Sequence, residues 1–152
     1  SLPPQLGGPP GGGATVVSEQ QAVLAQRDPR GYTAHLLATA RADEAWRFAT
    51  DTIPVGDAPD LWITLSEARA TSHPADTLPI YREVITGTLG VTDKKAYRTA
   101  AKLLQRMRTA AGAAGPVATA EFDQFLAETV DRNRRRPTCI DVFVRAGLIV
   151  RG

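Results

Sequence analysis

Residues 93–111, DKKAYRTAAKLLQRMRTAA, constrain the fold more than any other stretch of the chain. Their apolar residues recur three or four positions apart, which is the period of an α-helix with one buried face. The face consists of Ala96, Tyr97, Ala100, Leu103, Leu104, Met107 and Ala111. Thr92 is placed to cap this helix, and Asp93 brings a negative charge to its first turn. At ~1.5 Å per residue the helix is about 28 Å long, and the rest of the chain is expected to pack around it.

Short helices are predicted along most of the chain. They are expected over residues 18–28, 31–39, 41–52, 57–72, 74–90, 93–111, 119–136 and 138–147. Short loops between neighbouring helices favour antiparallel packing. The predicted fold class is therefore all-α, with six to eight helices in antiparallel hairpins that form a stack or bundle. Only the tail over residues 148–150 could be a strand.

Local signals predict where several helices begin and end. The expected N-caps are Ser18 (with Gln21), Asp57, Thr119 and Thr138 (with Asp141). Pro29 and Pro137 are expected to stop helices, and Pro79 to lie near the end of a first turn, where its missing N–H costs little. Gly112 and Gly115 predict a break. Gly147 followed by Leu148 predicts a Schellman motif at the end of the last helix.

Composition indicates one folded domain. Of the 152 residues, 43% are hydrophobic and 22% are charged, which is ordinary for a globular protein. Residues 1–13, SLPPQLGGPPGGG, predict a disordered linker. One helical domain is expected over residues 14–148, followed by a tail over 149–152. A linker at the start suggests that another domain precedes this one.

The cysteine count and the hydropathy pattern favour a cytoplasmic protein. Cys139 is the one cysteine, so no disulfide can form within the chain and a reducing compartment is expected. The sequence has no run of about 18 apolar residues and no signal peptide. No membrane partner is therefore expected.

Charge is spread unevenly along the chain. Residues 1–93 hold 6 Lys or Arg and 11 Asp or Glu, whereas residues 94–152 hold 12 and 5, so the formal charge changes from −5 to +7. Two groups of cations stand out, a stripe at four-residue spacing and a cluster further on. They are Lys94, Arg98, Lys102 and Arg106, and then Arg132, Arg134, Arg135 and Arg136. One interpretation is a solvated surface with arginines at a helix C-terminus, and the other is a patch that contacts phosphates, as in nucleic acid.

Ser72, His73 and Asp76 have the residue types of a catalytic triad. They are neighbours at the start of a helix, whereas a triad is defined by its geometry, and the favoured interpretation is that they cap and charge this helix. His35 is expected at the edge of the core. Cys139 could be a thiolate activated by a helix N-terminus and the nearby arginines, but a buried structural thiol is favoured.

Other candidate sites lack the required pattern. The acidic residues Asp43, Glu44, Asp57, Asp60 and Glu67 do not match the alternating ligands of an EF-hand. The glycines of residues 7–13 lack the Lys-Ser/Thr of a phosphate-binding loop. No catalytic residue, cofactor or metal site is predicted, and the chain is not expected to be an enzyme.

Residues 34–49, AHLLATARADEAWRFA, resemble a tetratricopeptide helical hairpin. Leu36 lies on its first helix, and residues 43–46, DEAW, open the second. Ala40 stands in the turn, where that family usually has glycine. Helix pairs begin at irregular intervals along the chain, so the resemblance implies a right-handed tetratricopeptide-like bundle or short solenoid rather than a regular array.

A second resemblance covers residues 31–148. The motifs that carry it are DEAW (43–46), LW (61–62), SHPAD (72–76), LPIY (78–81), Tyr97 with AAKLL (100–104), EF (121–122), FL (125–126), RRRP (134–137) and AGL (146–148). They resemble the C-terminal helical region of bacterial SWIM zinc-finger proteins, especially actinobacterial ones. The resemblance implies that the zinc ligands lie in a separate upstream module, since one Cys and two His cannot complete a four-ligand zinc site here.

Two functional hypotheses follow. The resemblance and the hairpin spacing favour a non-enzymatic interaction or scaffold module that docks a protein partner or the upstream module of the same protein. The alternative is an auxiliary nucleic-acid-binding domain, in which the basic stripe and cluster contact phosphates.

Overall fold

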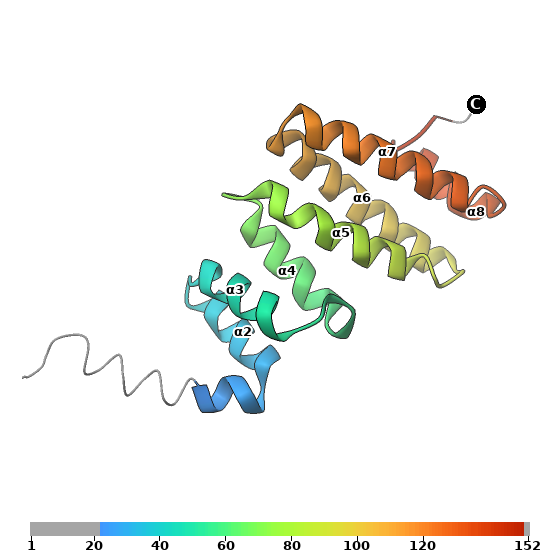
Figure 1. Ribbon diagram of the computed structural model, residues 1–152. Helices are drawn as coiled ribbons and strands as arrows, with labels where there is room; N and C mark the ends of the chain where they lie inside the picture. The colour runs from blue at the N-terminus through green and yellow to red at the C-terminus, as the bar shows by residue number, and fades with distance from the viewer. Residues whose placement is uncertain (1–21, 151–152) are drawn as a thin grey trace, which may run out of the picture. The chain divides into compact units, whose positions relative to one another are not determined.

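The computed structural model describes residues 22–150, and every regular element in that range is helical (Figure 1). The all-α prediction is confirmed for these residues, and residues 148–150 form no strand. The chain divides after Pro54 into two compact units, whereas one helical domain is predicted over residues 14–148. The expected linker of residues 1–13 lies outside the described residues.

The described part of the first unit consists of short helices. They are residues 22–27, α2 (Pro29–Ala38) and α3 (Ala42–Thr52). Asp28 separates the first two and caps α2, where its carboxylate accepts a hydrogen bond from the Gly31 amide at 3.0 Å. The preceding helix ends just before Pro29, as expected, and Pro29 is also the first residue of α2, which was expected to begin at Gly31. Proline suits this position because the first amides of a helix have no acceptor within it. The predicted capping box at Ser18 lies outside the described residues.

The turn between α2 and α3 places a non-glycine residue in the left-handed region. Ala40 has a φ of 60°. Its amide donates to the Leu37 carbonyl at 3.2 Å, and the Arg41 amide donates to the Leu36 carbonyl at 2.8 Å. This pair of bonds is a Schellman motif, whose left-handed position usually holds glycine. The backbone therefore keeps the turn that glycine would favour, although alanine occupies it.

An aromatic pair and small side chains join α2 to α3. The rings of Tyr32 and Phe48 meet edge to face, with 4.8 Å between their centroids. Leu36 of α2 and Ala45 and Ala49 of α3 are buried. The alanines let the two helices approach closely, as expected for a short helical hairpin.

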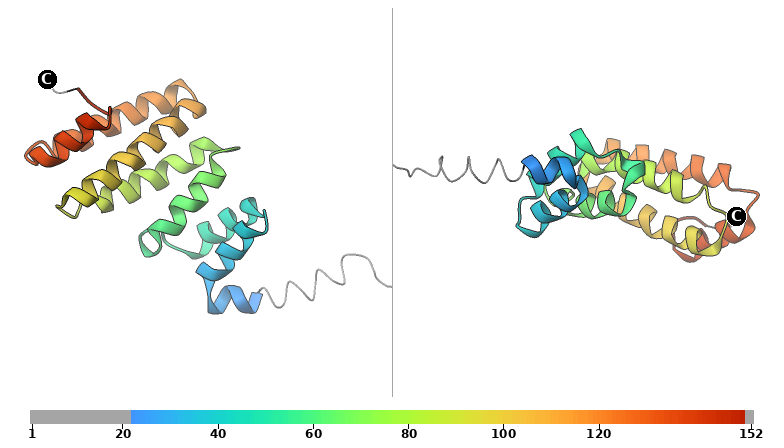
Figure 2. Two further views of the ribbon diagram at one scale, coloured as in Figure 1. Left: turned by 180° about the vertical axis from the view of Figure 1, so that it is seen from behind. Right: turned by 90° about the horizontal axis from the view of Figure 1, so that it is seen from below.

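The second unit holds a 3-10 turn and longer helices. They are η1 (Val55–Asp57), α4 (Pro59–Arg69), α5 (Pro74–Thr88), α6 (Lys94–Ala114), α7 (Pro116–Arg132) and α8 (Pro137–Arg145). α4 packs against α5, α5 against α6 and α6 against α7, whereas α8 packs against α6. As a result, α5 and α7 form one layer, and α6 and α8 lie in a second layer (Figure 2, right).

Proline, rather than a polar cap, starts most of these helices. α4, α5, α7 and α8 each begin with proline, and none of the four has a side-chain cap. The N-caps predicted at Asp57, Thr119 and Thr138 are therefore wrong: Asp57 lies in η1, and the threonines lie inside α7 and α8. Proline presets a helical φ and has no N–H to satisfy, so these helices begin without a polar cap. Pro79 is the sixth residue of α5, just beyond the predicted first turn.

α6 differs from its predicted limits at both ends. The Ala96 amide donates to Asp93 Oδ1 at 2.7 Å, so Asp93, and not Thr92, is the N-cap. The helix continues through Gly112, which was predicted to break it. The break falls at Gly115, whose φ of 124° is accessible mainly to glycine.

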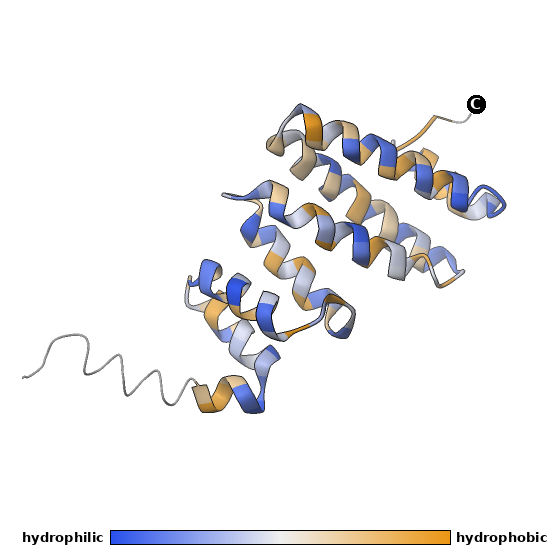
Figure 3. Cartoon of the chain, in the orientation of Figure 1, coloured by the Kyte–Doolittle hydropathy of each residue, from blue (hydrophilic) through white to orange (hydrophobic). Residues whose placement is uncertain are grey.

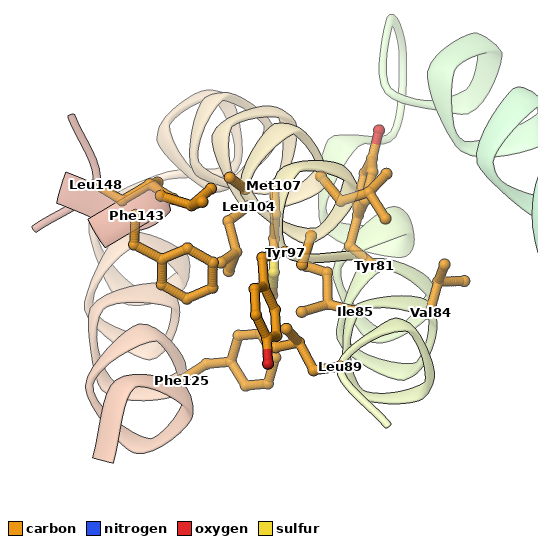
Figure 4. Close-up of a cluster of buried hydrophobic side chains, with 14 of the residues drawn as sticks. Tyr81, Val84, Ile85, Leu89, Tyr97, Leu104, Met107, Phe125, Phe143 and Leu148 are labelled. Carbon is orange, nitrogen blue, oxygen red and sulfur yellow. The ribbon is translucent and has the colours of Figure 1, made fainter. Parts of the chain in front are cut away.

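The core of the second unit forms around α6. Figure 4 shows side chains from α5, α7 and α8 converging on it, among them Ile85, Phe125 and Phe143. Leu104 lies at the centre and is fully buried. The predicted apolar face is confirmed at Tyr97, Ala100, Leu103, Leu104, Met107 and Ala111, whereas Ala96 is only half-buried.

The chain leaves α8 through the predicted Schellman motif. Gly147 has a φ of 74°, and its amide donates to the Val144 carbonyl at 3.0 Å. The Leu148 amide donates to the Phe143 carbonyl at 3.1 Å, and the Leu148 side chain is buried in the core. This hydrophobic contact is the usual companion of the motif, and it anchors the end of α8.

Replacing Leu104 by alanine should lower the free energy of unfolding by about 2–5 kcal/mol, because the change leaves a cavity in a closely packed site. Urea denaturation followed by circular dichroism measures the loss. Leu24→Ala, at a residue that is 42% exposed, is the chemically matched control and should cost less than about 1 kcal/mol. A similar small loss for Leu104→Ala would contradict the central position of α6.

Replacing Ala40 by glycine should stabilise the protein by about 0.5–1 kcal/mol. An L-residue in the left-handed region costs roughly 1–2 kcal/mol, and the extra freedom of glycine in the unfolded chain offsets part of the gain. Thermal unfolding measures the effect. Ala34→Gly, on the exposed surface of α2, should have the opposite sign. If both variants lost stability equally, the left-handed turn at Ala40 would be refuted.

Candidate interaction surfaces

Three residues of the predicted basic stripe border one pocket between α6 and α8. Lys94, Arg98 and Lys102 lie on successive turns of α6, and Arg145 of α8 faces them across a volume of about 320 Å³. Asp141 is the one acidic residue that lines this pocket, and it pairs with Arg145 at 3.2 Å. The pocket therefore carries an excess of positive charge.

The fourth residue of the stripe has a different contact. Arg106 pairs with Glu67 of α4, with 2.9 Å between Nη1 and Oε2 and both side chains about half exposed. An exposed pair of this kind contributes less than about 1 kcal/mol. The stripe thus divides into three cations around a pocket and a fourth that joins α4 to α6.

The lysines at the start of α6 do not stabilise that helix. Lys94 and Lys95 occupy its first turn, which has no acidic residue. The N-terminal end of a helix dipole is positive, so cations there are disfavoured by roughly 0.3–1 kcal/mol each. Helix stability therefore does not account for the charge at this end of α6.

The arginine cluster is fixed to the fold through Arg136. Its Nη1 donates to the Leu89 carbonyl at 2.8 Å and to Asn133 Oδ1 at 3.0 Å. Leu89 lies in the loop that leads into α6, so this bond joins the α7–α8 loop to the start of α6. The predicted stripe and cluster therefore begin at the same end of the second unit, where Figure 3 shows the α7–α8 loop as strongly hydrophilic. Arg134 pairs with Asp131 at 3.2 Å, in an exposed position.

A second basic pocket, of about 320 Å³, lies between the C-terminal ends of α5 and α7. Arg132 and Arg136 line it together with Thr86 and Thr129, whereas Arg135 does not. Thr129 is 3% exposed, and its hydroxyl has no hydrogen-bond partner among residues 22–150. Two of the predicted cations thus lie beside a buried polar group that is not satisfied by the fold itself.

An apolar pocket of about 760 Å³, absent from the sequence-based predictions, lies between α5 and the N-terminal half of α7. Pro79 of α5 and Phe122 of α7 line opposite walls, and Met107 of α6 also lines it. Val117 borders it and is 74% exposed. An exposed valine on a helix gives no sequence signal of a pocket, which arises only when α5 and α7 pack side by side.

The two pockets between α5 and α7 adjoin at Thr86, and we call them together the furrow. Thr86 lines both of them. Since α5 and α7 each run antiparallel to α6, they are parallel to each other, and the furrow has an apolar N-terminal half and a basic C-terminal half. Between the halves, the Arg82 guanidinium of α5 lies over the Phe125 ring of α7, 4.8 Å from its centroid.

The triad residue types do not form a triad. Ser72 Oγ lies 2.8 Å from His73 Nδ1, but Asp76 pairs with Arg69 of α4 at 2.9 Å. His73 is the N-cap residue of α5 without a side-chain cap, so the predicted capping role is wrong, whereas Asp76 does lie in the first turn of α5. The predicted charging of this helix is thus confirmed at Asp76.

His35 and Cys139 lie in opposite environments. His35 is exposed on α2, and not at the edge of the core as predicted. Cys139 is fully buried, as favoured from the sequence. Burial raises the pKa of the Cys139 thiol, and the nearby Arg136 lowers it by less. Because desolvation has the larger effect, the thiolate is disfavoured.

Neither a metal site nor a membrane span emerges from the described residues. Within residues 22–150, no group of three or more His, Cys, Asp or Glu side chains is placed to hold a metal ion. No helix in the same range combines the length and the apolar character needed to cross a membrane.

The Cys139 thiol should react slowly with a thiol reagent such as Ellman's reagent, because it is buried and its pKa is raised. Denaturant should bring the rate close to that of glutathione under the same conditions. The comparison of native and unfolded protein at mildly alkaline pH measures this difference, with Cys139→Ser as the blank. A native thiol as reactive as glutathione would show that Cys139 is accessible and ionised.

No protein-family model, curated protein or solved structure matches this chain. The similarity to SWIM zinc-finger proteins therefore stays a prediction from the motifs of the sequence.

Proposed function

We propose that this chain is a non-enzymatic protein-interaction module whose hairpins stack in a right-handed, tetratricopeptide-like manner. The observation that carries the proposal is the apolar pocket between α5 and α7. The resemblance to SWIM zinc-finger proteins supports an accessory role in a larger bacterial, cytoplasmic protein. The occupant of the pocket would be a protein partner or an upstream module of that protein.

The pocket suits apolar side chains of a partner. Burying a Leu- or Phe-sized side chain contributes about 1.5–3 kcal/mol, and pockets that receive such anchors dominate the energy of most interfaces. Micromolar binding needs roughly 8 kcal/mol after the costs of association. Two or three anchors seated beside Pro79 and Phe122 supply a large part of that energy.

A displayed library of random peptides, selected on the whole chain, tests this proposal. Selected peptides should carry apolar residues at fixed spacing, and their binding should weaken at least tenfold in Val117→Glu, which places a charge at the border of the pocket. Glutamate in the first turn of α7 suits the helix dipole, so folding should be preserved.

Val23→Glu is the matched control, because Val23 is also exposed, at 53%, but lies in the helix of residues 22–27 in the first unit. It should bind the selected peptides like the wild type. Failure to select any peptide, or equal loss of binding in both variants, would refute docking at this pocket.

Binding of a nucleic-acid backbone is the second candidate function. The specific observation in its favour is that Lys94, Arg98, Lys102 and Arg145 surround one pocket, with lysines where the helix dipole disfavours them. A phosphate group bound in this pocket would lie close to several cations, since neighbouring members of the stripe are one helical turn apart on α6. Binding would weaken steeply with salt, by about one unit of log-log slope for each phosphate neutralised.

The double variant Arg98→Glu/Lys102→Glu should abolish binding to a mixed-sequence duplex in a salt series followed by fluorescence anisotropy. Arg27→Glu/Arg47→Glu, which makes the same change of net charge on exposed residues of the first unit, is the control. Equal affinity of the two variants would rule out the α6–α8 pocket as a phosphate site.

A further inference from the structure

The geometry points to a specific class of partner for the furrow between α5 and α7: we infer that it binds a peptide segment with apolar anchors at one end and carboxylates at the other. The inference rests on the proposed function, since it assigns the chemistry of the partner to the same surface. It also fixes the direction of the segment, with its acidic end toward the C-termini of α5 and α7.

The apolar half of the furrow is unfavourable for the carboxylates of the bound peptide. Glu83 of α5 and Glu121 of α7 border this half from opposite walls. Arg82, the one cation there, is stacked on Phe125. Carboxylates of a partner would meet two like charges at this end, which is unfavourable by Coulomb repulsion. Apolar anchors, with neutral or basic neighbours, fit this half.

The basic half of the furrow offers unused hydrogen-bond donors. Arg132 has no ion pair or hydrogen bond among the described residues, and Arg136 uses only its Nη1. The buried Thr129 hydroxyl is also unpartnered there, and no acidic residue lines this half. Arginine binds carboxylates through paired N–H groups, and these charge-assisted bonds are the strong ones.

The helix ends do not cancel this positive charge. α5 and α7 both end at this pocket, and the carbonyl end of a helix is negative. The Leu89 carbonyl, however, accepts from Arg136 at 2.8 Å, and the Thr129 carbonyl accepts from Asn133 Nδ2 at 2.8 Å. Because these two carbonyls already accept hydrogen bonds, they do not occupy Arg132 or the remaining donors of Arg136. These donors are available to a ligand.

The spacing of the two halves defines the length of the segment. Ala118 lines the apolar half and Arg132 the basic half, and both lie on α7. At ~1.5 Å of rise per residue they are about 21 Å apart along the helix axis. An extended peptide covers that distance in about six residues, and a helical one in about 14.

Synthetic fluorescein-labelled peptides of about 20 residues test the inference on the whole chain. Each carries a Leu-Phe pair near one end, with an Asp pair about six residues away in an extended design or about 14 away in a helical design. Control peptides of the same length carry Asn or Lys in place of the Asp pair. Fluorescence anisotropy at low salt measures their affinities for the wild type and three variants, Arg132→Gln, Arg135→Gln and Val117→Glu.

One of the two Asp peptides should bind the wild type at least tenfold more tightly than its Asn partner, and the Lys peptide should bind weakest. Arg132→Gln should remove the advantage of Asp over Asn. Arg135→Gln, which loses the same charge outside the furrow, should keep it, and thermal unfolding should show that both variants are folded.

The other outcomes separate the inference from the proposed function. If Asp and Asn peptides bind equally well and Val117→Glu weakens both, the apolar pocket docks peptides but the carboxylate assignment is wrong. An Asp advantage lost equally in Arg132→Gln and Arg135→Gln would reflect only the overall charge of the loop, and would overturn the assigned site. If no peptide binds, both the inference and docking of peptides at the furrow fail.

Discussion

Burial of the apolar face of α6 is the interaction on which the second unit depends. Leu104 and Ala111 on α6 have no exposed surface, and side chains from α5, α7 and α8 close around the helix. α6 packs against α5, α7 and α8, and its buried residues lie among theirs in the core cluster. The positions of α5 and α7, and so the walls of the furrow, are set by how each one packs against α6. The surface proposed to bind a partner is in this way a by-product of the core contacts that α5 and α7 make with α6.

Charge is organised by the loops at one end of this unit. The bond from Arg136 to the Leu89 carbonyl holds the α7–α8 loop against the α5–α6 loop. It brings cations that are about 40 residues apart in the sequence to a single end of the fold. Cations placed together repel one another, and the lysines at the start of α6 work against its dipole. Cations that lower the stability of the fold in this way are more often explained by binding of a ligand than by a contribution to folding.

The sequence predicts local features of this protein well and non-local ones poorly. The face of α6 and the Schellman motif at Gly147 follow from patterns within a few residues, since helical period and left-handed glycine act locally. Helix starts are mispredicted, because proline at the first position replaces the polar caps expected at Asp57 and Thr119. The ion pair of Arg106 with Glu67 depends on how α4 packs against its neighbours. The furrow needs α5 and α7 side by side, and no pattern within either helix encodes that pairing.

The return of α8 to α6 has a consequence for the two basic pockets. α8 packs against α6, and its end is anchored by the Schellman motif, by the Gln105 bond to the Ala146 carbonyl and by the Arg108 bond to the Gly147 carbonyl. α8 supplies one wall of the pocket around Arg98, and its N-cap residue Arg136 also lines the basic half of the furrow. The two candidate binding surfaces therefore share one structural support, the docking of α8 on α6, and a change that loosens this contact disturbs both.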